Sequence, residues 1–169
     1  MKSLINSEPM RHLKKIVLSA AISLSVISIA TSTAASAKTA TIKQTIQTLQ
    51  KSDQRWIQVN LSTQRLIAWE GKKRVYAVAI STGKRTTPTR VGSFKIQSKY
   101  KSARMRGRDY DVAKVPYTMY YQGSYGIHGA YWHKKFGTPV SHGCINVAPN
   151  HAKWLFNWAS LGTAVIIHK

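Results

Sequence analysis

From Trp56 onward the chain breaks into short runs of β-forming residues separated by turn residues, and this pattern limits the fold more than any other feature. Several runs alternate apolar and polar side chains, as strands with one buried face do. Gly71 and Gly83 directly follow two of the runs, where tight turns are favoured. The runs cover residues 56–61, 65–70, 74–82, 92–99, 117–122, 125–131 and 163–169. Many short strands with regular turns predict a sheet fold of the sandwich or barrel type.

Residues 149–161 depart from this pattern, because their apolar side chains recur at helical spacing. Pro149 suits the first turn of a helix, and Gly162 stands where a glycine commonly follows a helix end. This is the one principal helix that the sequence predicts, and we expect it to pack on the sheet. Its tryptophans are interpreted as core residues rather than as a ligand platform.

The first 37 residues have the three parts of a secretory signal peptide. Residues 1–15 carry four basic side chains against one acidic side chain, an apolar run follows over 16–30, and Ala35-Ser36-Ala37 forms a small-residue cleavage pattern. The apolar run is short for a membrane span, so no stable span is expected after cleavage. An uncleaved anchor is the alternative. The sequence thus predicts secretion across the cytoplasmic membrane, to the periplasm or the cell wall.

Residues 38–54 lie between this segment and the strand pattern. Ile42, Ile46 and Leu49 are spaced four and three residues apart, so a short amphipathic helix and a linker are both expected alternatives. Residues 38–169 are long enough for one domain with its own core, and we expect a monomer.

Net charge narrows the choice of partners. The whole chain has a formal charge of +21, and without residues 1–37 it keeps 22 basic and 4 acidic residues, a formal +18. Such a surface attracts anions. Nucleic acid would be the first candidate for a cytoplasmic protein, but an exported one is expected to meet anionic wall polymers and acidic substrates instead. The basic residues are scattered along the sequence, so the charge by itself identifies no specific partner.

Cys144 is the only cysteine, in the run "TPVSHGCINVAP" at 138–149. A lone cysteine in an exported protein is a small buried residue, half of an intermolecular bridge, or a reactive thiol. A nucleophilic thiol needs a base, and it needs hydrogen-bond donors for the oxyanion, here expected from the N–H groups of residues 142–144. The expected helix starts five residues later, so its dipole is a candidate to lower the thiol pKa.

Two histidines are candidates for the base. His142 lies two residues from the cysteine, a spacing that rarely gives good hydrogen-bond geometry. His128 lies sixteen residues before the cysteine, and a loop between them can bring it opposite. A papain-like site would orient this ring with an Asn or Asp, for which Asp109 and Asp111 are the distant candidates, whereas the carbonyl of Gly129 is the local one.

A zinc site is the rival chemistry. Its possible ligands are His128, His133, His142, Cys144 and His151. However, no glutamate follows Glu70, and the chain has no HExxH pattern. We therefore expect neither a metal nor a cofactor.

These residues resemble the L,D-transpeptidase catalytic domain of the YkuD-like family. The run "IHGAYWHKKFGTPVSHGCIN" at 127–146 is similar to that family's His-Gly pair, loop, and Ser/Thr-His-Gly-Cys followed by a hydrophobic residue and Asn or Arg. Upstream, "ISTGKRTTPTRVGSF" at 80–94 is similar to the family's Ser-Thr-Gly and Thr-Pro-x-Gly-x-Phe stretch, with Arg90-Val91 as a variation before the second glycine. The resemblance covers about residues 55–169.

The resemblance implies a mainly β, β-sandwich-like catalytic domain with one principal helix after the catalytic cysteine, acting on peptidoglycan in cell wall biogenesis. Cys144 would attack the third residue of a tetrapeptide stem, release D-alanine and form a thioester. The amine of another stem would resolve the thioester into a 3→3 cross-link. His128 would act as general base and then acid, with His142 in support. The substrate-binding residues would be Ser141, Gly143, Asn146, Gly129, Tyr117 and Met119.

Several alternatives stay open within and beside this class. Water as the acceptor would give an L,D-carboxypeptidase, and a protein amine would give an anchoring enzyme. A non-enzymatic, cationic wall-binding module would require loss of the thiol or the base, and both are present. Arg104, Arg106 and Arg108 are candidates to bind a stem carboxylate if their loop folds over the cleft, and the alternative is a solvated loop.

Overall fold

The protein was analysed as a computed structural model, which describes residues 36, 37 and 39–169. The chain divides into two compact units, Met1–Ala37 and Lys38–Lys169. The signal peptide expected over 1–37 lies, apart from its last two residues, outside the described residues. Within the described part, no helix is both long enough and apolar enough to cross a membrane.

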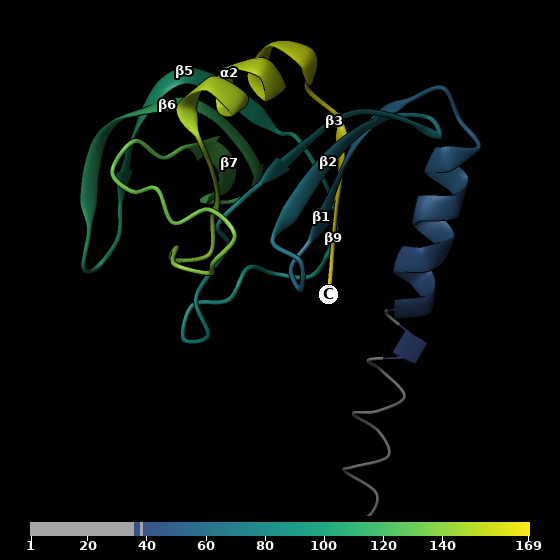
Figure 1. The fold of residues 1–169 in the computed structure, drawn as a ribbon, viewed down its shortest axis with the longest axis horizontal. Helices are drawn as coiled ribbons and strands as arrows, with labels where there is room; N and C mark the ends of the chain where they lie inside the picture. Colours follow the sequence, from purple (N-terminus) through teal and green to yellow (C-terminus); the bar gives the residue numbers. More distant parts are fainter. Residues whose placement is uncertain (1–35, 38) are drawn as a thin grey trace, which may run out of the picture. The chain divides into compact units, whose positions relative to one another are not determined.

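The first sheet has five strands, in the order β3-β2-β1-β9-β4 (Figure 1). Only β1 and β9 are parallel, and the other neighbouring strands are antiparallel. Gly71, with φ of +55°, makes the tight turn between β2 and β3, and an added Cβ there would lie 2.2 Å from the Ser52 carbonyl oxygen. The strands are β1 (Arg55–Asn60), β2 (Arg65–Glu70), β3 (Lys73–Ala79), β4 (Gly92–Lys95) and β9 (Ala164–His168).

The second sheet has four strands, in the order β5-β6-β7-β8. Its first three strands are antiparallel, and β7 and β8 are parallel. The strands are β5 (Ser98–Arg106), β6 (Asp111–Gln122), β7 (Tyr125–Gly129) and β8 (Ile145–Val147). Residues 98–106 were only partly expected as a strand, and β8 was not expected at all. β7 carries His128, and Cys144 directly precedes β8, so the parallel pair brings together the two residues with the chemistry predicted from sequence.

One hydrophobic core joins both sheets and the helix that follows the cysteine. Ile57, Leu66 and Val165 enter it from the first sheet, Met119 and Ile127 enter it from the second, and all five are fully buried. Two sheets that share such a core form a sandwich. The mainly β, sandwich-like fold expected from the sequence is therefore confirmed.

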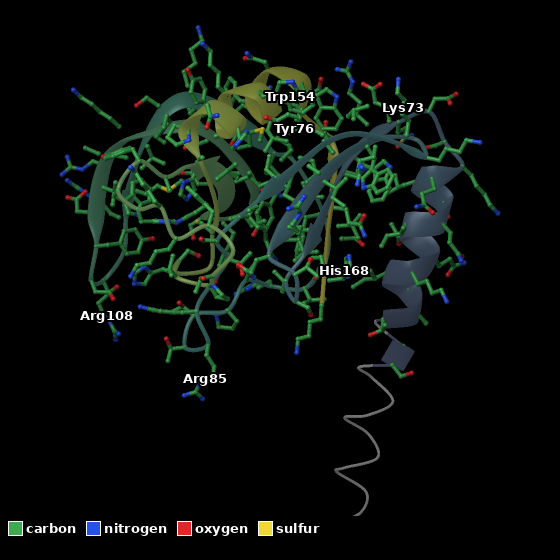
Figure 2. All side chains as sticks on the ribbon, in the orientation of Figure 1. Lys73, Tyr76, Arg85, Arg108, Trp154 and His168 are labelled. Atoms are coloured by element: carbon green, nitrogen blue, oxygen red, sulfur yellow. The ribbon has the colours of Figure 1, made fainter. Side chains whose placement is uncertain are left out.

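The helix α2 (Pro149–Trp158) begins where the sequence predicted but ends three residues earlier than expected. The Lys99 ammonium hydrogen-bonds the carbonyls of Phe156 and Ala159, so a cation from β5 satisfies the C-terminal end of α2. Trp154 stacks on Tyr76 of β3 with ring centroids 3.9 Å apart, and the two labelled rings lie together in Figure 2. Because the ring faces are occupied by each other, these aromatics serve packing.

A second helix covers residues 39–50. Its apolar side chains Ile42 and Leu49 pack against Trp56 of β1 and Ile166 of β9. This cluster lies on the face of the first sheet that points away from the main core. The segment before the strands is thus part of the domain's packing.

Candidate functional site

The register of β7 and β8 places the base and the thiol on one face of the second sheet. His128 pairs with Asn146, and Ile127 pairs with Ile145. Continuing this register by one residue puts Cys144 beside Gly126, two residues from His128 along the neighbouring strand. A strand spacing of ~4.8 Å and a rise of ~3.3 Å per residue give a diagonal Cα separation of about 8 Å, which an imidazole side chain spans. The two side chains are therefore diagonal neighbours.

His128 is buried, with 2% of its surface exposed. Its Nδ1–H donates to the carbonyl oxygen of Gly129 at 3.1 Å, as the sequence led us to expect of this carbonyl. The proton is therefore on Nδ1, and Nε2 keeps its lone pair. The pKa of His128 is lowered to about 4, mainly by burial; the hydrogen bond to Gly129 opposes this shift, and the charge of nearby His133 adds to it. The ring is neutral at neutral pH and able to accept a proton.

Cys144 is partly exposed, and its sulfur donates to the Ser124 carbonyl at 3.7 Å. Burial of the thiol raises its pKa, and a hydrogen bond from the Gly126 backbone works in the opposite direction. With the thiol pKa raised and the His128 pKa lowered, the resting pair is thiol and neutral imidazole rather than an ion pair. The expectation that the dipole of α2 lowers the thiol pKa was wrong, because β8 separates the cysteine from the helix start and such effects fade within one turn.

The loop before the cysteine is shaped by Ser141. Its hydroxyl accepts from the Gly143 N–H at 3.1 Å and donates to the Cys144 carbonyl at 2.6 Å. Gly143 has φ of +115°, and Thr89 donates to its carbonyl at 2.8 Å. The Gly143 N–H is therefore engaged, which corrects the expectation that it is an oxyanion donor. The N–H groups of His142 and Cys144 remain as candidates.

His142 contacts the turn between β5 and β6. Its Nε2 lies 3.1 Å from Asp109 Oδ2, and its ring lies 4.8 Å from that of Tyr110. The Lys84 ammonium lies 3.4 Å from the same nitrogen. The hydrogen bond with His142 is the main cause that lowers the pKa of Asp109. His142 thus connects the motif loop to the hairpin tip, a link between positions 33 residues apart that the sequence did not reveal.

Asn146 lies beneath the loop rather than at its surface. It is 3% exposed, its backbone bonds to Ser81 in both directions, and its side-chain amide lies 2.9 Å from His133 Nε2. The Lys135 N–H donates to the Nδ1 of this same histidine at 3.2 Å. From the sequence, His133 was expected only as a possible zinc ligand. In the structure its charge contributes to the lowered pKa of His128. Its position in the loop that joins the two motif halves was the available signal.

Gly129, Met119 and Tyr117, three of the residues expected to bind substrate, have different surroundings. Gly129 is packed closely, since an added Cβ would lie 2.8 Å from the Pro116 ring. Met119 is fully buried in the main core, and the Tyr117 ring packs on Phe156 of α2. The burial of Met119 argues against the expected substrate contact at that position, and the expected contact of Tyr117, which is partly buried, stays a prediction.

The even positions of β6 lie on the face that carries the thiol. Tyr120 pairs with Gly126, the residue beside Cys144. Burial is the main cause that raises the pKa of Tyr120, and the charge of Cys144 adds to it. Thr118 comes next on this face, one position from the pair of Met119 and Ile127. An error of one residue in assigning the faces of a strand exchanges its two faces. The odd positions were assigned to the substrate side, and Tyr120 was therefore not among the predicted site residues.

The basic run on β5 is already neutralised in part. Arg104 makes a two-pronged contact with Asp111, at 2.8 and 2.6 Å, and Arg106 lies 3.2 Å from the same carboxylate. Arg108 stands at the hairpin tip, labelled in Figure 2, and is exposed. The candidate role of Arg104 and Arg106 as free cations for a stem carboxylate is therefore not supported, because Asp111 occupies both.

The ligands proposed for the zinc alternative are not gathered into one site in the described part of the chain. No group of three or more His, Cys, Asp or Glu side chains gathers there in a way that would hold a metal ion. His142 is occupied by Asp109, and His151 accepts or donates at Tyr76 Oη, 2.7 Å away.

Comparison with known proteins gives consistent matches. The family model of the L,D-transpeptidase catalytic domain, YkuD, matches residues 54–167. L,D-transpeptidase 1 of Mycobacterium tuberculosis is 31% identical over a region covering 50% of this chain and 39% of that protein. A solved Enterococcus faecium L,D-transpeptidase is 30% identical with a TM-score of 0.65, covering 69% of this chain and 50% of that one.

A second solved structure, the carbamoyl enzyme that Ldtfm forms with avibactam, is 31% identical with a TM-score of 0.64, covering 68% of this chain and 49% of that one. The chain thus spans half or less of the length of these relatives. The family model covers more than half of the chain, and the matched segment contains both His128 and Cys144. The chain belongs to the YkuD family of L,D-transpeptidase catalytic domains.

Proposed function

We propose that this chain is a peptidoglycan L,D-transpeptidase that forms 3→3 cross-links between peptide stems through a cysteine thioester. The observation that carries the proposal is the diagonal placement of Cys144 and His128 on one sheet face, with Nδ1 of the histidine bonded to Gly129 and Nε2 left as a base. Acyl transfer by a thiol needs this pair. The names of the relatives, all L,D-transpeptidases, support the same reaction.

The first half of the proposed reaction acylates the thiol. His128 Nε2 accepts the Cys144 proton as the sulfur attacks the carbonyl carbon of the third stem residue. The N–H groups of His142 and Cys144 are the candidates to donate to the oxyanion. His128 then gives its proton to the departing D-alanine amine, and the thioester remains. Because the resting pair is neutral, the thiol has to pass its proton to His128 Nε2 for the sulfur to attack.

The second half transfers the acyl group. The side-chain amine of a neighbouring stem attacks the thioester carbonyl, and His128 accepts the proton that this amine loses. The carbon–sulfur bond breaks, and the sulfur takes the proton back from Nε2. One amide bond has been exchanged for another, with no net oxidation or reduction and no cofactor.

The setting of the reaction is part of the proposal. We infer that the chain acts as a monomer after export, in the periplasm or cell wall, with residues 1–37 as the signal peptide and 55–169 as the catalytic domain. The basic surface, a formal +18 without residues 1–37, favours contact with stem carboxylates and anionic wall polymers.

The test is incubation of the protein with purified tetrapeptide-bearing muropeptides, followed by mass analysis. A cross-linked dimer supports the transpeptidase, whereas tripeptide without dimer would make the protein a carboxypeptidase. Cys144→Ala and His128→Ala should each abolish both products. His142→Ala should retain acylation, because His142 points toward Asp109.

An inhibitor gives a second, independent readout. One solved relative is a carbamoyl enzyme formed with avibactam, and another was solved with one cysteine replaced by serine. We expect avibactam to add its full mass to this chain, and Cys144→Ser to prevent the adduct. A mass increase on the Cys144→Ser variant would contradict the assignment of the nucleophile.

A further inference from the structure

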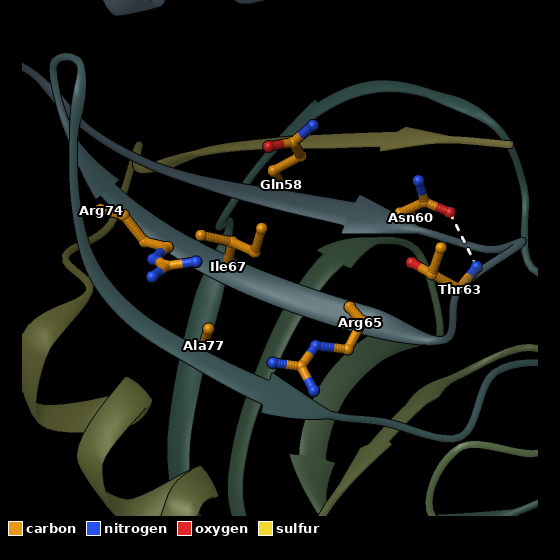
Figure 3. A pocket seen from close by; sticks show the side chains of 7 residues that line it. All are labelled: Gln58, Asn60, Thr63, Arg65, Ile67, Arg74 and Ala77. Atoms are coloured by element: carbon orange, nitrogen blue, oxygen red, sulfur yellow. Dashed lines mark hydrogen bonds between the residues drawn. The ribbon is translucent and has the colours of Figure 1, made fainter.

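The outer face of the first sheet, away from the main core, carries a groove over β1, β2 and β3. Gln58, Ile67 and Ala77 are register partners across these strands and form one row on this face. The groove has a volume of about 230 Å³. It is lined by Gln58, Asn60, Thr63, Arg65, Ile67, Arg74 and Ala77 (Figure 3).

Two arginines border this row on opposite sides. Arg65 comes two residues before Ile67 on β2, and Arg74 pairs with Trp69, two residues after it. Figure 3 shows the two guanidinium groups on either side of Ala77. Arg65 and Trp69, the register partner of Arg74, are four positions apart on β2, a rise of roughly 13 Å along the strand. The small side chain of Ala77 leaves the space between them open.

Both arginines are without an acidic partner within the described residues. The ion pairs there involve Arg55, Arg104, Arg106 and His142. An unpaired guanidinium presents a planar fork of donors that fits a carboxylate. The groove therefore carries two charges for which the described part of the protein supplies no counter-charge.

The remaining polar walls are held in place. The Trp69 indole donates to Gln58 Oε1 at 3.0 Å, and His168 Nε2 lies 2.9 Å from the Gln58 amide nitrogen. Asn60 Oδ1 accepts from the Thr63 N–H at 2.9 Å, so the Asn60 amide nitrogen is left as a donor. The groove thus combines fixed amide and hydroxyl groups with an apolar floor.

We propose that this groove binds a peptide stem of peptidoglycan through its carboxylates. The inference rests on the proposed function, which supplies the stem as a substrate class. An extended peptide rises ~3.3 Å per residue, so this rise of roughly 13 Å along β2 matches about four residues. Small apolar stem residues fit over Ile67 and Ala77, and carboxylates on either side meet Arg65 and Arg74.

The stem bound in this groove belongs to a different glycan strand from the stem that reacts with Cys144. Cys144 and His128 lie on the second sheet, whereas the groove is on the outward face of the first sheet, and the main core separates them. A stem held in the groove cannot reach the thiol. It instead keeps the domain on the wall polymer between reactions, because a second contact raises the effective concentration of stems at the cleft.

The experiment compares two charge-matched double variants in a Cys144→Ala background, so that binding is measured without turnover. Arg65→Gln with Arg74→Gln removes the groove cations, and Lys72→Gln with Lys73→Gln removes two exposed charges from the adjacent turn. Binding is measured by co-sedimentation with sacculi freed of phosphate polymers. The double arginine substitution should weaken binding about tenfold or more. The double lysine substitution should weaken it less than about threefold.

Further readouts separate the outcomes. In the Cys144 protein, the arginine variant should keep wild-type kcat and KM on soluble muropeptides, and all variants should keep the wild-type melting temperature. Equal loss of binding in both double variants would mean that net charge alone explains the binding. That result would overturn the proposal that the groove binds a stem. Loss seen only with sacculi that retain phosphate polymers would replace the stem by those polymers. Absence of turnover in the wild type would reject the proposed function while leaving the binding result readable.

Discussion

The Nδ1–H of His128 donates to the carbonyl oxygen of its own neighbour, Gly129, at 3.1 Å. In many cysteine enzymes a carboxylate or amide side chain orients the histidine. Here the backbone does so, and no charge is placed behind the ring. A neutral partner stabilises an imidazolium less than a carboxylate would, which agrees with the lowered pKa of about 4.

The burial of neutral His128 makes stability depend on acid pH. Its pKa is about 4 when folded and 6.5 when exposed, so below pH 6.5 the unfolded chain binds the proton first. The free energy of unfolding should fall by about 3 kcal/mol between pH 6.5 and 4 from this residue. Denaturant titrations at several pH values should show this loss in wild type and in His142→Asn. A His128→Asn variant that kept the full loss would contradict the assignment.

The raised pKa of Cys144 predicts a slow thiol at neutral pH. The rate constant of alkylation by iodoacetamide should continue to increase beyond pH 9, because burial keeps the proton on sulfur. Cys144 is the only cysteine, so the label reports on it without background, and Cys144→Ser serves as the blank. A plateau below pH 8 would show a thiolate–imidazolium pair instead.

Gly143 is predicted to tolerate no side chain. Its φ is +115°, and an added Cβ would lie 2.5 Å from the Tyr125 ring. Gly137 is the matched control, since its φ is +99° but nothing lies within 4 Å of an added Cβ. Gly137→Ala should cost about 1 kcal/mol from strain and Gly143→Ala about 1–3 kcal/mol more, measured by denaturant unfolding. Equal costs would mean that the Tyr125 contact has no effect.

The contact between Asp109 and His142 is predicted to restrain the hairpin tip near the thiol. The pair is exposed, so its loss is worth at most about 1 kcal/mol. Asp109→Ala should therefore speed iodoacetamide labelling of Cys144 up to about fivefold at constant pH. Asp53→Ala, which removes an exposed acid away from the hairpin, should leave the labelling rate unchanged. A fully unchanged rate in Asp109→Ala would remove the tip from the control of access.

Substitutions on the two faces of β6 are predicted to have different effects, one on stability and the other on substrate binding. Met119→Ala removes a fully buried side chain and should lower the free energy of unfolding by about 2–5 kcal/mol. Tyr120→Ala should leave stability closer to wild type and raise KM for soluble muropeptides, because Tyr120 lies on the thiol's face. If Met119→Ala raised KM with unchanged stability, the face assignment would be reversed.

The sequence predicted the sandwich, the helix after the cysteine and the placement of Cys144 with His128, because these depend on local periodicity and on a distinctive motif. The face of β6 was not predictable in the same way. Residues 117–121 are large or apolar at nearly every position, so period two defines two sets but does not say which set is buried.

Other features were not predicted because their sequence pattern is weak or because they depend on contacts between residues far apart in the chain. The strand β5 carries four Lys and Arg side chains, spread over both of its faces, and β8 is only three residues long, so neither gave a strong pattern. The Asp109 contact of His142 and the hydrogen bond that engages the Gly143 N–H depend on how loops meet after folding.

The place of β9 between β1 and β4 has a consequence for the order of assembly. β9 is the last strand in sequence, yet it is an inner strand of the first sheet and pairs in parallel with the first. The sheet cannot close until residues 164–168 have emerged from the ribosome, more than 100 residues after β1, and such long-range pairing is slow. For a protein that we propose is exported, this delay keeps the polypeptide extended during passage through a narrow translocation channel.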